Sequence, residues 1–228
     1  LARLIAQYCI DRAIPFTALD GDRSHGALLR FYNDFSSSID LDHYESADEI
    51  VHHALESERV VLVDLGAQSN KALQRWISDN GLVELCQEMN MPLLFWHVMD
   101  DGKDSVDLLE QLLGRFGDTV SYVVVKNKGR GNRFSIFENS NAKEKAMAVD
   151  AHIIELDQLY PGTMNKIDEI NSSFWAAANN REPQAGRCLN LLERRRVKIW
   201  LENGYRTLDE LGCFSMKSEA SASVQLID

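Results

Sequence analysis

Short apolar runs alternate with helical patterns along most of the chain. Apolar residues at three- and four-residue spacing predict helices over 1–9, 24–32, 47–57, 71–77, 82–89 and 105–113. Apolar runs of strand length lie at 16–20, 60–64, 93–98 and 120–126, and residues 151–156 could form one more strand. Continuous runs are typical of strands buried on both faces, and their alternation with helices predicts an α/β fold with a mostly parallel sheet flanked by helices.

The alternation of predicted strands and helices gives way to mostly helical patterns after about residue 140. Helical spacing returns at 167–178 and at 189–201, and the polar segment 179–186 between them is typical of a linker. We therefore expect an α/β domain over 1–180, a helical C-terminal extension over 181–214 and a polar, frayed tail over 215–228.

Two of the predicted strands end in carboxylates. Asp20 and Asp22 close the run at 16–20, and Asp64 closes the run at 60–64. Because the carboxyl ends of parallel strands lie at one edge of a sheet, where open α/β folds bind ligands, these side chains are expected to meet there. Gathered carboxylates repel one another unless a cation or proton intervenes, and their oxygens suit Mg²⁺ bound with a phosphate substrate. The alternatives are structural: Asp64 could cap the following helix, and Asp20 and Asp22 could belong to a turn.

A glycine-rich phosphate loop, G-x-x-x-x-G-K-[ST], does not occur in the sequence. The chain starts with the amphipathic spacing of a helix from Leu1 to Cys9, without an N-cap residue or a preceding strand. Such a helix is typical of the position after a phosphate loop in a strand–loop–helix unit. We therefore expect this strand and loop to lie upstream of Leu1, the alternative being an ordinary exposed N-terminal helix.

Length, apolar runs and cysteine spacing limit the classes of protein to which the chain can belong. A chain of 228 residues with 45% hydrophobic content is long enough for one well-buried domain, and it contains no apolar run of about 18 residues that could span a membrane. Its cysteines are far apart and have no C-x-x-C spacing, which argues against a zinc site and a disulfide framework. A reducing cytoplasm is the expected location.

The charge is strongly acidic overall but basic in one segment. A net charge of −11 disfavours extensive wrapping by nucleic acid. Between Arg181 and Arg206, however, basic residues outnumber acidic ones, and Arg194, Arg195, Arg196 and Lys198 follow one another on a predicted helix. These four residues could contact DNA or an acidic partner, or form a solvated helix face. Leu189, Leu192 and Trp200 are expected to anchor this helix to the core.

Three motifs together resemble the ParA/MinD family of deviant phosphate-loop ATPases. Leu19-Asp20-Gly21-Asp22 is similar to that family's D-x-D element, Val61-Leu62-Val63-Asp64 to its Walker B strand, and Val123-Val124-Val125-Lys126-Asn127 to a later strand that ends in asparagine. The resemblance covers residues 1–180 in element order. It implies a phosphate-loop NTPase-like fold that binds ATP and Mg²⁺ and dimerises around two nucleotides.

The resemblance also implies roles for individual residues. Asp22 would position the attacking water, while Asp20 and Asp64 would hold the metal. Asn127 would read the adenine edge with its amide, although asparagine is also a common turn residue, and Leu156 would pack on the base. Gly66 could bring a backbone N–H close to the γ-phosphate, because it lacks a Cβ.

One departure from the family pattern leaves the activity open. The family's second switch usually contains proline, as in D-x-P-P, whereas this chain has Asp64-Leu65-Gly66-Ala67. The leading expectation is a cytoplasmic ATP-hydrolysing switch protein, of the kind that acts in plasmid partition or conjugal DNA transfer. An ATP-dependent ligase on the same fold and a non-hydrolysing adaptor are the alternatives.

Overall fold

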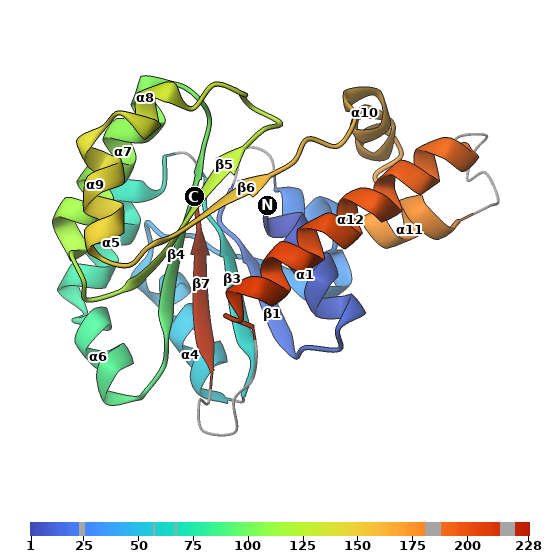
Figure 1. Ribbon diagram of the computed structural model, residues 1–228. Coiled ribbons are helices and arrows are strands. Elements are labelled where there is room, and N and C mark those ends of the chain that lie inside the picture. Colours follow the sequence, from blue (N-terminus) through green and yellow to red (C-terminus); the bar gives the residue numbers. More distant parts are fainter. Residues whose placement is uncertain (23–25, 57, 67, 181–187, 215–221) are drawn as a thin grey trace.

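The computed structural model describes residues 1–22, 26–56, 58–66, 68–180, 188–214 and 222–228. In these ranges it contains a seven-stranded sheet in which every strand is parallel, with the order β2-β1-β3-β7-β4-β5-β6 (Figure 1). The strands are β1 (Phe16–Asp20), β2 (Ser36–Ser38), β3 (Val60–Asp64), β4 (Leu93–Met99), β5 (Ser121–Asn127), β6 (His152–Leu156) and β7 (Ser223–Ile227). The predicted α/β class with a parallel sheet is confirmed.

Helices cover both faces of the sheet. One face is covered by the elements from the middle of the chain: α3 (Tyr44–Ala47), α4 (Glu49–Glu56), α5 (Asn70–Asp79), α6 (Leu82–Glu88), α7 (Lys103–Phe116), α8 (Ser135–Glu138) and α9 (Asn141–Ala148). The other face is covered by α1 (Ala2–Asp11), α2 (Ala27–Phe31), α10 (Pro161–Glu169), α11 (Phe174–Asn179) and α12 (Leu191–Leu211). A short 3-10 helix, η1 (Asn33–Phe35), precedes β2.

Residues of the inner strands alternate between the two layers of the core. Val61 and Val63 of β3 pack in the first cluster, whereas Leu62 between them packs in the second. The alternation follows from the pleat of a strand, which directs successive side chains to opposite faces. Because both faces are covered by helices, these strands are apolar at nearly every position, which is why they were visible in the sequence.

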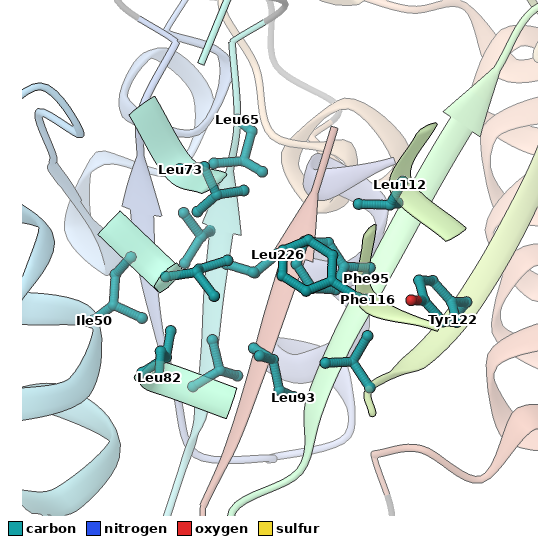
Figure 2. Packing of buried hydrophobic residues seen from close by; sticks show 14 of the residues in the cluster. Ile50, Leu65, Leu73, Leu82, Leu93, Phe95, Leu112, Phe116, Tyr122 and Leu226 are labelled. Carbon is teal, nitrogen blue, oxygen red and sulfur yellow. The ribbon is translucent and has the colours of Figure 1, made fainter. Parts of the chain in front are cut away.

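The last strand of the chain lies in the middle of the sheet. β7 pairs with β3 on one side and with β4 on the other, and its Val224 and Leu226 are buried. The prediction of a polar, frayed tail over 215–228 is therefore wrong for residues 223–227, while residues 215–221 lie outside the described ranges. Figure 2 shows Leu226 beside Phe95, its register partner on β4, within the larger core cluster.

A buried amide explains why this strand was missed in the sequence. Gln225 interrupts the apolar run of β7, and its Oε1 accepts a hydrogen bond from the indole N–H of Trp96 at 2.7 Å. Its Nε2 donates to the hydroxyl of Ser223 at 3.2 Å. Because the amide is bonded through both of its polar atoms, the strand tolerates a polar residue at a buried position.

The C-terminal helix is part of the same packed structure. α12 contacts α1, α10, α11 and β6, and its Leu208 belongs to the core cluster that also contains residues of α1 and β3. The predicted anchoring holds for Leu189, which is buried, but not for Leu192, which is exposed. The predicted linker lies mostly within residues 181–187, outside the described ranges. Among the helices that the structure describes, none is long and apolar enough to cross a membrane.

Truncating the centre of β7 should destabilise the whole fold. Leu226→Ala removes a fully buried side chain and leaves a cavity between β3 and β4, so the free energy of unfolding should fall by about 3 kcal/mol. Leu108→Ala on α7, where the side chain is 42% exposed, is the matched control and should change it by less than about 0.5 kcal/mol. Urea denaturation followed by circular dichroism measures both. Equal effects of the two substitutions would contradict a central position of β7.

Candidate functional site

The strand order places a switch point at the carboxyl end of β7. Strands that precede β3 in the chain, β1 and β2, lie on one side of it, and β4, β5 and β6 lie on the other, with β7 between β3 and β4. Open α/β sheets bind ligands in the crevice at such a point. Helix α1 begins near the same point, as the interaction between the amino group of Leu1 and the carboxylate of Asp64 indicates. The marked ends of the chain accordingly both lie at the carboxyl edge in Figure 1.

Asp20 lies at this edge but is occupied by backbone hydrogen bonds. It is the register partner of Asp64 on β3, and its carboxylate is buried. One oxygen accepts from the N–H of Asp22 at 3.1 Å, and the other accepts from the N–H groups of Leu28 and Leu29 at 2.8 and 3.0 Å. Asp20 therefore caps the start of α2 and holds the following turn in place. Its role as a metal ligand stays a prediction.

Asp22 and Gly66 bring the two predicted switch segments into contact. Gly21 donates its N–H to the carbonyl of Asp64 at 2.8 Å, so the turn after β1 lies on the end of β3. A Cβ added to Gly66 would lie 3.3 Å from the Cα of Asp22 and 3.5 Å from its Oδ1. Only glycine allows the segments to approach this closely without displacement. The three carboxylates expected at one edge, Asp20, Asp22 and Asp64, do lie near one another there, while the roles expected for them and for Gly66 stay predictions.

Burial gives Asp64 an unusual affinity for protons. It raises the pKa of this carboxyl to about 6, and the neighbouring Asp20 and Asp22 act in the same direction, while the amino group of Leu1 opposes them. Within the described residues, no three side chains of His, Cys, Asp or Glu are arranged to hold a metal ion by themselves. Mg²⁺ bound with a nucleotide needs fewer protein ligands, because phosphate oxygens and waters complete its shell.

A cavity of about 350 Å³ adjoins this edge and contains two further predicted residues. Asn127 and Leu156, which pair across β5 and β6, both line it, together with residues of α1, α10 and α12. The side-chain oxygen of Asn127 accepts a hydrogen bond from the N–H of Gly129 at 3.0 Å. Asn127 therefore has the turn role that the sequence left open, and its role in reading an adenine edge stays a prediction.

A chain of cation–π and ring–ring contacts runs along one wall of the cavity, which Arg3, Phe174 and Trp200 line. The guanidinium carbon of Arg3 lies 3.6 Å from the ring centre of Phe31 and 4.6 Å from that of Phe174, and the ring of Phe174 lies 5.0 Å from that of Trp200. Arg3 also forms an ion pair of 2.7 Å with Asp168 on α10. Sequence reasoning missed this wall, because its residues come from five separate helices and form no motif.

The basic loop after β5 is largely neutralised. Lys126 pairs with Glu138 and Glu155, and Lys128 pairs with Glu155 at 2.6 Å and with Asp157 at 3.0 Å. These contacts hold the pKa of Glu155 at about 2, chiefly through the hydrogen bonds from Lys128 and Lys126. Arg130 of the same loop lines the cavity and has no ion pair in the described residues.

A buried histidine fixes the end of β7 to β4. His97 lies between two hydrogen-bond acceptors, with Nδ1 3.0 Å from the carboxylate of Asp228 and Nε2 2.8 Å from the carbonyl of Ser105. Both ring nitrogens must carry a proton to satisfy them. Burial alone would lower the pKa of His97, but Asp228 raises it above the ordinary value. No local pattern in the sequence marks His97, because it has no metal-ligand spacing to the other histidines.

The four predicted basic contact residues lie on α12, away from the carboxylates. The guanidinium of Arg194 donates to the carbonyl of Asn180 at 3.1 Å, and that of Arg196 lies 5.3 Å from the ring centre of Tyr160. Arg195 and Lys198 are exposed and have no ion pair in the described part of the chain. The patch is therefore a separate surface, and not a part of the site around Asp64.

Comparison with known proteins gives no match, neither to a family model, nor to a curated protein, nor to a solved structure.

The raised pKa of Asp64 predicts a pH-dependent stability. The folded state binds the proton more tightly than the unfolded chain, whose aspartate pKa is about 3.9, so this contribution is complete below pH 4 and is lost as the pH rises through about 6. Asp64→Asn should therefore stabilise the protein at pH 7, by at most about 3 kcal/mol, and by less at pH 4. Denaturant unfolding at both pH values tests this, with Asp104→Asn on α7 as control. A mutant less stable than the parent at pH 7 would contradict it.

Proposed function

We propose that the chain binds ATP with Mg²⁺ at the carboxyl edge of the sheet, as a nucleotide-dependent switch protein. The observation that carries this proposal is the convergence, at one switch point, of the end of β7, the start of α1 and the carboxylates of Asp22 and Asp64. A parallel strand followed in space by the N-terminus of a helix is the arrangement that suits a phosphate group, since the helix dipole and its free N–H groups attract anions.

Each part of the nucleotide has a corresponding part of the site. The phosphates lie at the start of α1, and Mg²⁺ offsets the unfavourable negative charge of the Asp64 carboxylate. The base enters the cavity beside Asn127 and Leu156, where the amide NH₂ of Asn127 donates to a ring nitrogen. Arg130 at the same cavity offsets phosphate charge. The cavity volume is in the range of small-ligand sites.

Asp22 is the residue that handles the attacking water. It borders Gly66, so a γ-phosphate that reaches the backbone of Gly66 also comes close to the Asp22 carboxylate. A carboxylate in this position orients the water and accepts its proton as the phosphoanhydride bond breaks. Binding and release of the γ-phosphate would move the segments after β1 and β3 relative to each other, and that movement is the switch.

Joining β7 to α1 provides a direct test of nucleotide binding. The variant is a circular permutation: a loop with the pattern G-x-x-x-x-G-K-[ST] links Asp228 to Leu1, and the new chain ends lie between Phe214 and Ala222. Its affinity for MgATP should be about tenfold or more higher than that of the parent, because the added loop supplies backbone N–H groups and a lysine for the phosphates. Calorimetric titration measures both. The control replaces the loop lysine by alanine.

A second substitution locates the metal in the joined variant. Asp64→Ala should weaken binding of MgATP more than binding of ATP in the presence of EDTA, because it removes the contact to the cation. Equal affinity of the joined variant and the parent, with both folded by circular dichroism, would overturn the proposed site.

Hydrolysis should depend on Asp22 more than binding does. In the joined variant, Asp22→Asn should leave MgATP affinity within about threefold and lower the rate of phosphate release by about a hundredfold, because positioning of the water acts on the transition state. Asp104→Asn serves as the control. Phosphate release that continues at the parental rate would remove Asp22 from the mechanism.

A further inference from the structure

The start of α12 carries an apolar and basic stripe that nothing in the described structure covers. Leu191, Leu192, Arg195, Lys198 and Ile199 have the spacing of one helix face, and all five are exposed. Leu191 is 73% exposed and Leu192 is 65% exposed, whereas the opposite side of the helix is buried through residues such as Val197. We call these five residues the basic stripe. Leucines this exposed on an otherwise well-packed helix indicate an interaction surface.

An exposed stripe of opposite charge lies on α4. Glu49, His52, Leu55 and Glu56 share one side of this helix, and Leu55 is 49% exposed. The histidine side chains of α4 approach the carboxylates only at 3.7 to 3.9 Å, so Glu49 and Glu56 remain open to a cationic partner. We call these four residues the acidic stripe. It is part of a segment, residues 34–58, in which the sequence contains no Lys or Arg.

The two stripes cannot meet within one molecule. α4 packs through Ile50 and Ala54 on the first face of the sheet, while α12 packs through Val197, Leu201 and Leu208 on the opposite face. The sheet and both helical layers separate them, as Figure 1 also shows for α4 and α12. Contact between the stripes therefore requires two copies of the chain.

We propose that the basic stripe of α12 docks on the acidic stripe of α4 of a second copy, in a head-to-tail association. Arg195 and Lys198 face Glu49 and Glu56 of the neighbour, while Leu191, Leu192 and Ile199 are buried against Leu55. Because the two surfaces differ, each bound copy leaves one stripe of each kind free. Such a heterologous contact produces a ring if the rotation closes and an open filament if it does not.

The composition of the stripe favours a protein partner over other anions. DNA would pair with Arg195 and Lys198 but would leave three exposed aliphatic side chains unburied, and Glu202 one turn further along α12 would repel it. The acidic body of the chain likewise disfavours an anionic lipid surface. A helix that offers both carboxylates and an apolar side chain satisfies both parts of the stripe, and α4 is such a helix.

A charge-swap experiment on the full chain tests this association. Sedimentation velocity at low ionic strength should show an average mass of the parent that rises with protein concentration. Arg195→Glu with Lys198→Glu should weaken the association at least about tenfold, and Glu49→Lys with Glu56→Lys should do the same. All four substitutions in one chain restore opposite charges and should recover most of the association. Lys71→Glu with Arg133→Glu, an equal charge change at other exposed positions, is the control.

Salt and alternative ligands complete the test. The association should weaken as ionic strength rises, because the Debye length falls from about 10 Å at 0.1 M to about 3 Å at 1 M. A parent that stays monomeric up to its solubility limit, or a four-fold variant that does not recover, would overturn the proposal. So would a parent that binds a DNA fragment or anionic vesicles through Arg195 and Lys198 without associating with itself. Circular dichroism verifies that every variant folds. These outcomes do not depend on nucleotide and leave the ATP site to its own tests.

Discussion

The pairing of β7 with both β3 and β4 is the constraint on which the rest of the structure depends. This strand lies between β3 and β4 and so joins the half of the sheet formed by β1, β2 and β3 to the half formed by β4, β5 and β6. Its Val224 and Leu226 are buried in the larger core cluster. Without it, the backbone groups of β3 and β4 that bond to β7 would have no partners, and unpaired buried N–H and C=O groups are costly. The parallel direction of β7 also brings its end to the edge at which β3 ends.

The candidate site follows from this arrangement, because the carboxyl edge of the sheet brings several carboxylates that repel one another close together. Asp20 is stabilised there by three backbone N–H groups, whereas burial and the neighbouring carboxylates raise the pKa of Asp64. The same edge holds His97, whose pKa is raised by the carboxylate of Asp228 beside it. An edge that concentrates both unsatisfied negative charge and the positive end of a helix is suited to a ligand that carries phosphates and a divalent cation.

The C-terminal helix connects the cavity with the outer surface. Trp200 lines the cavity and donates its indole N–H to the carbonyl of Asp157 at 2.6 Å, while Lys198 and Ile199, its neighbours in sequence, face outward. Arg3 and Phe174 join α12 to α1 through stacked contacts. One helix of 21 residues therefore carries both a side chain that lines the cavity and the basic stripe.

The sequence by itself determined the α/β class, most of the strands and the meeting of Asp20, Asp22 and Asp64 at one edge, because apolar runs and the positions of carboxylates after them are local properties. The tertiary structure alone decided that residues 223–227 form the central strand: their pattern is short and contains Gln225, whose burial depends on Trp96, a residue 129 positions away. It also decided the cavity wall, since Arg3, Phe174 and Trp200 are brought together only by packing. Local patterns report burial and secondary structure, whereas strand order and side-chain partners are long-range properties that no local pattern contains.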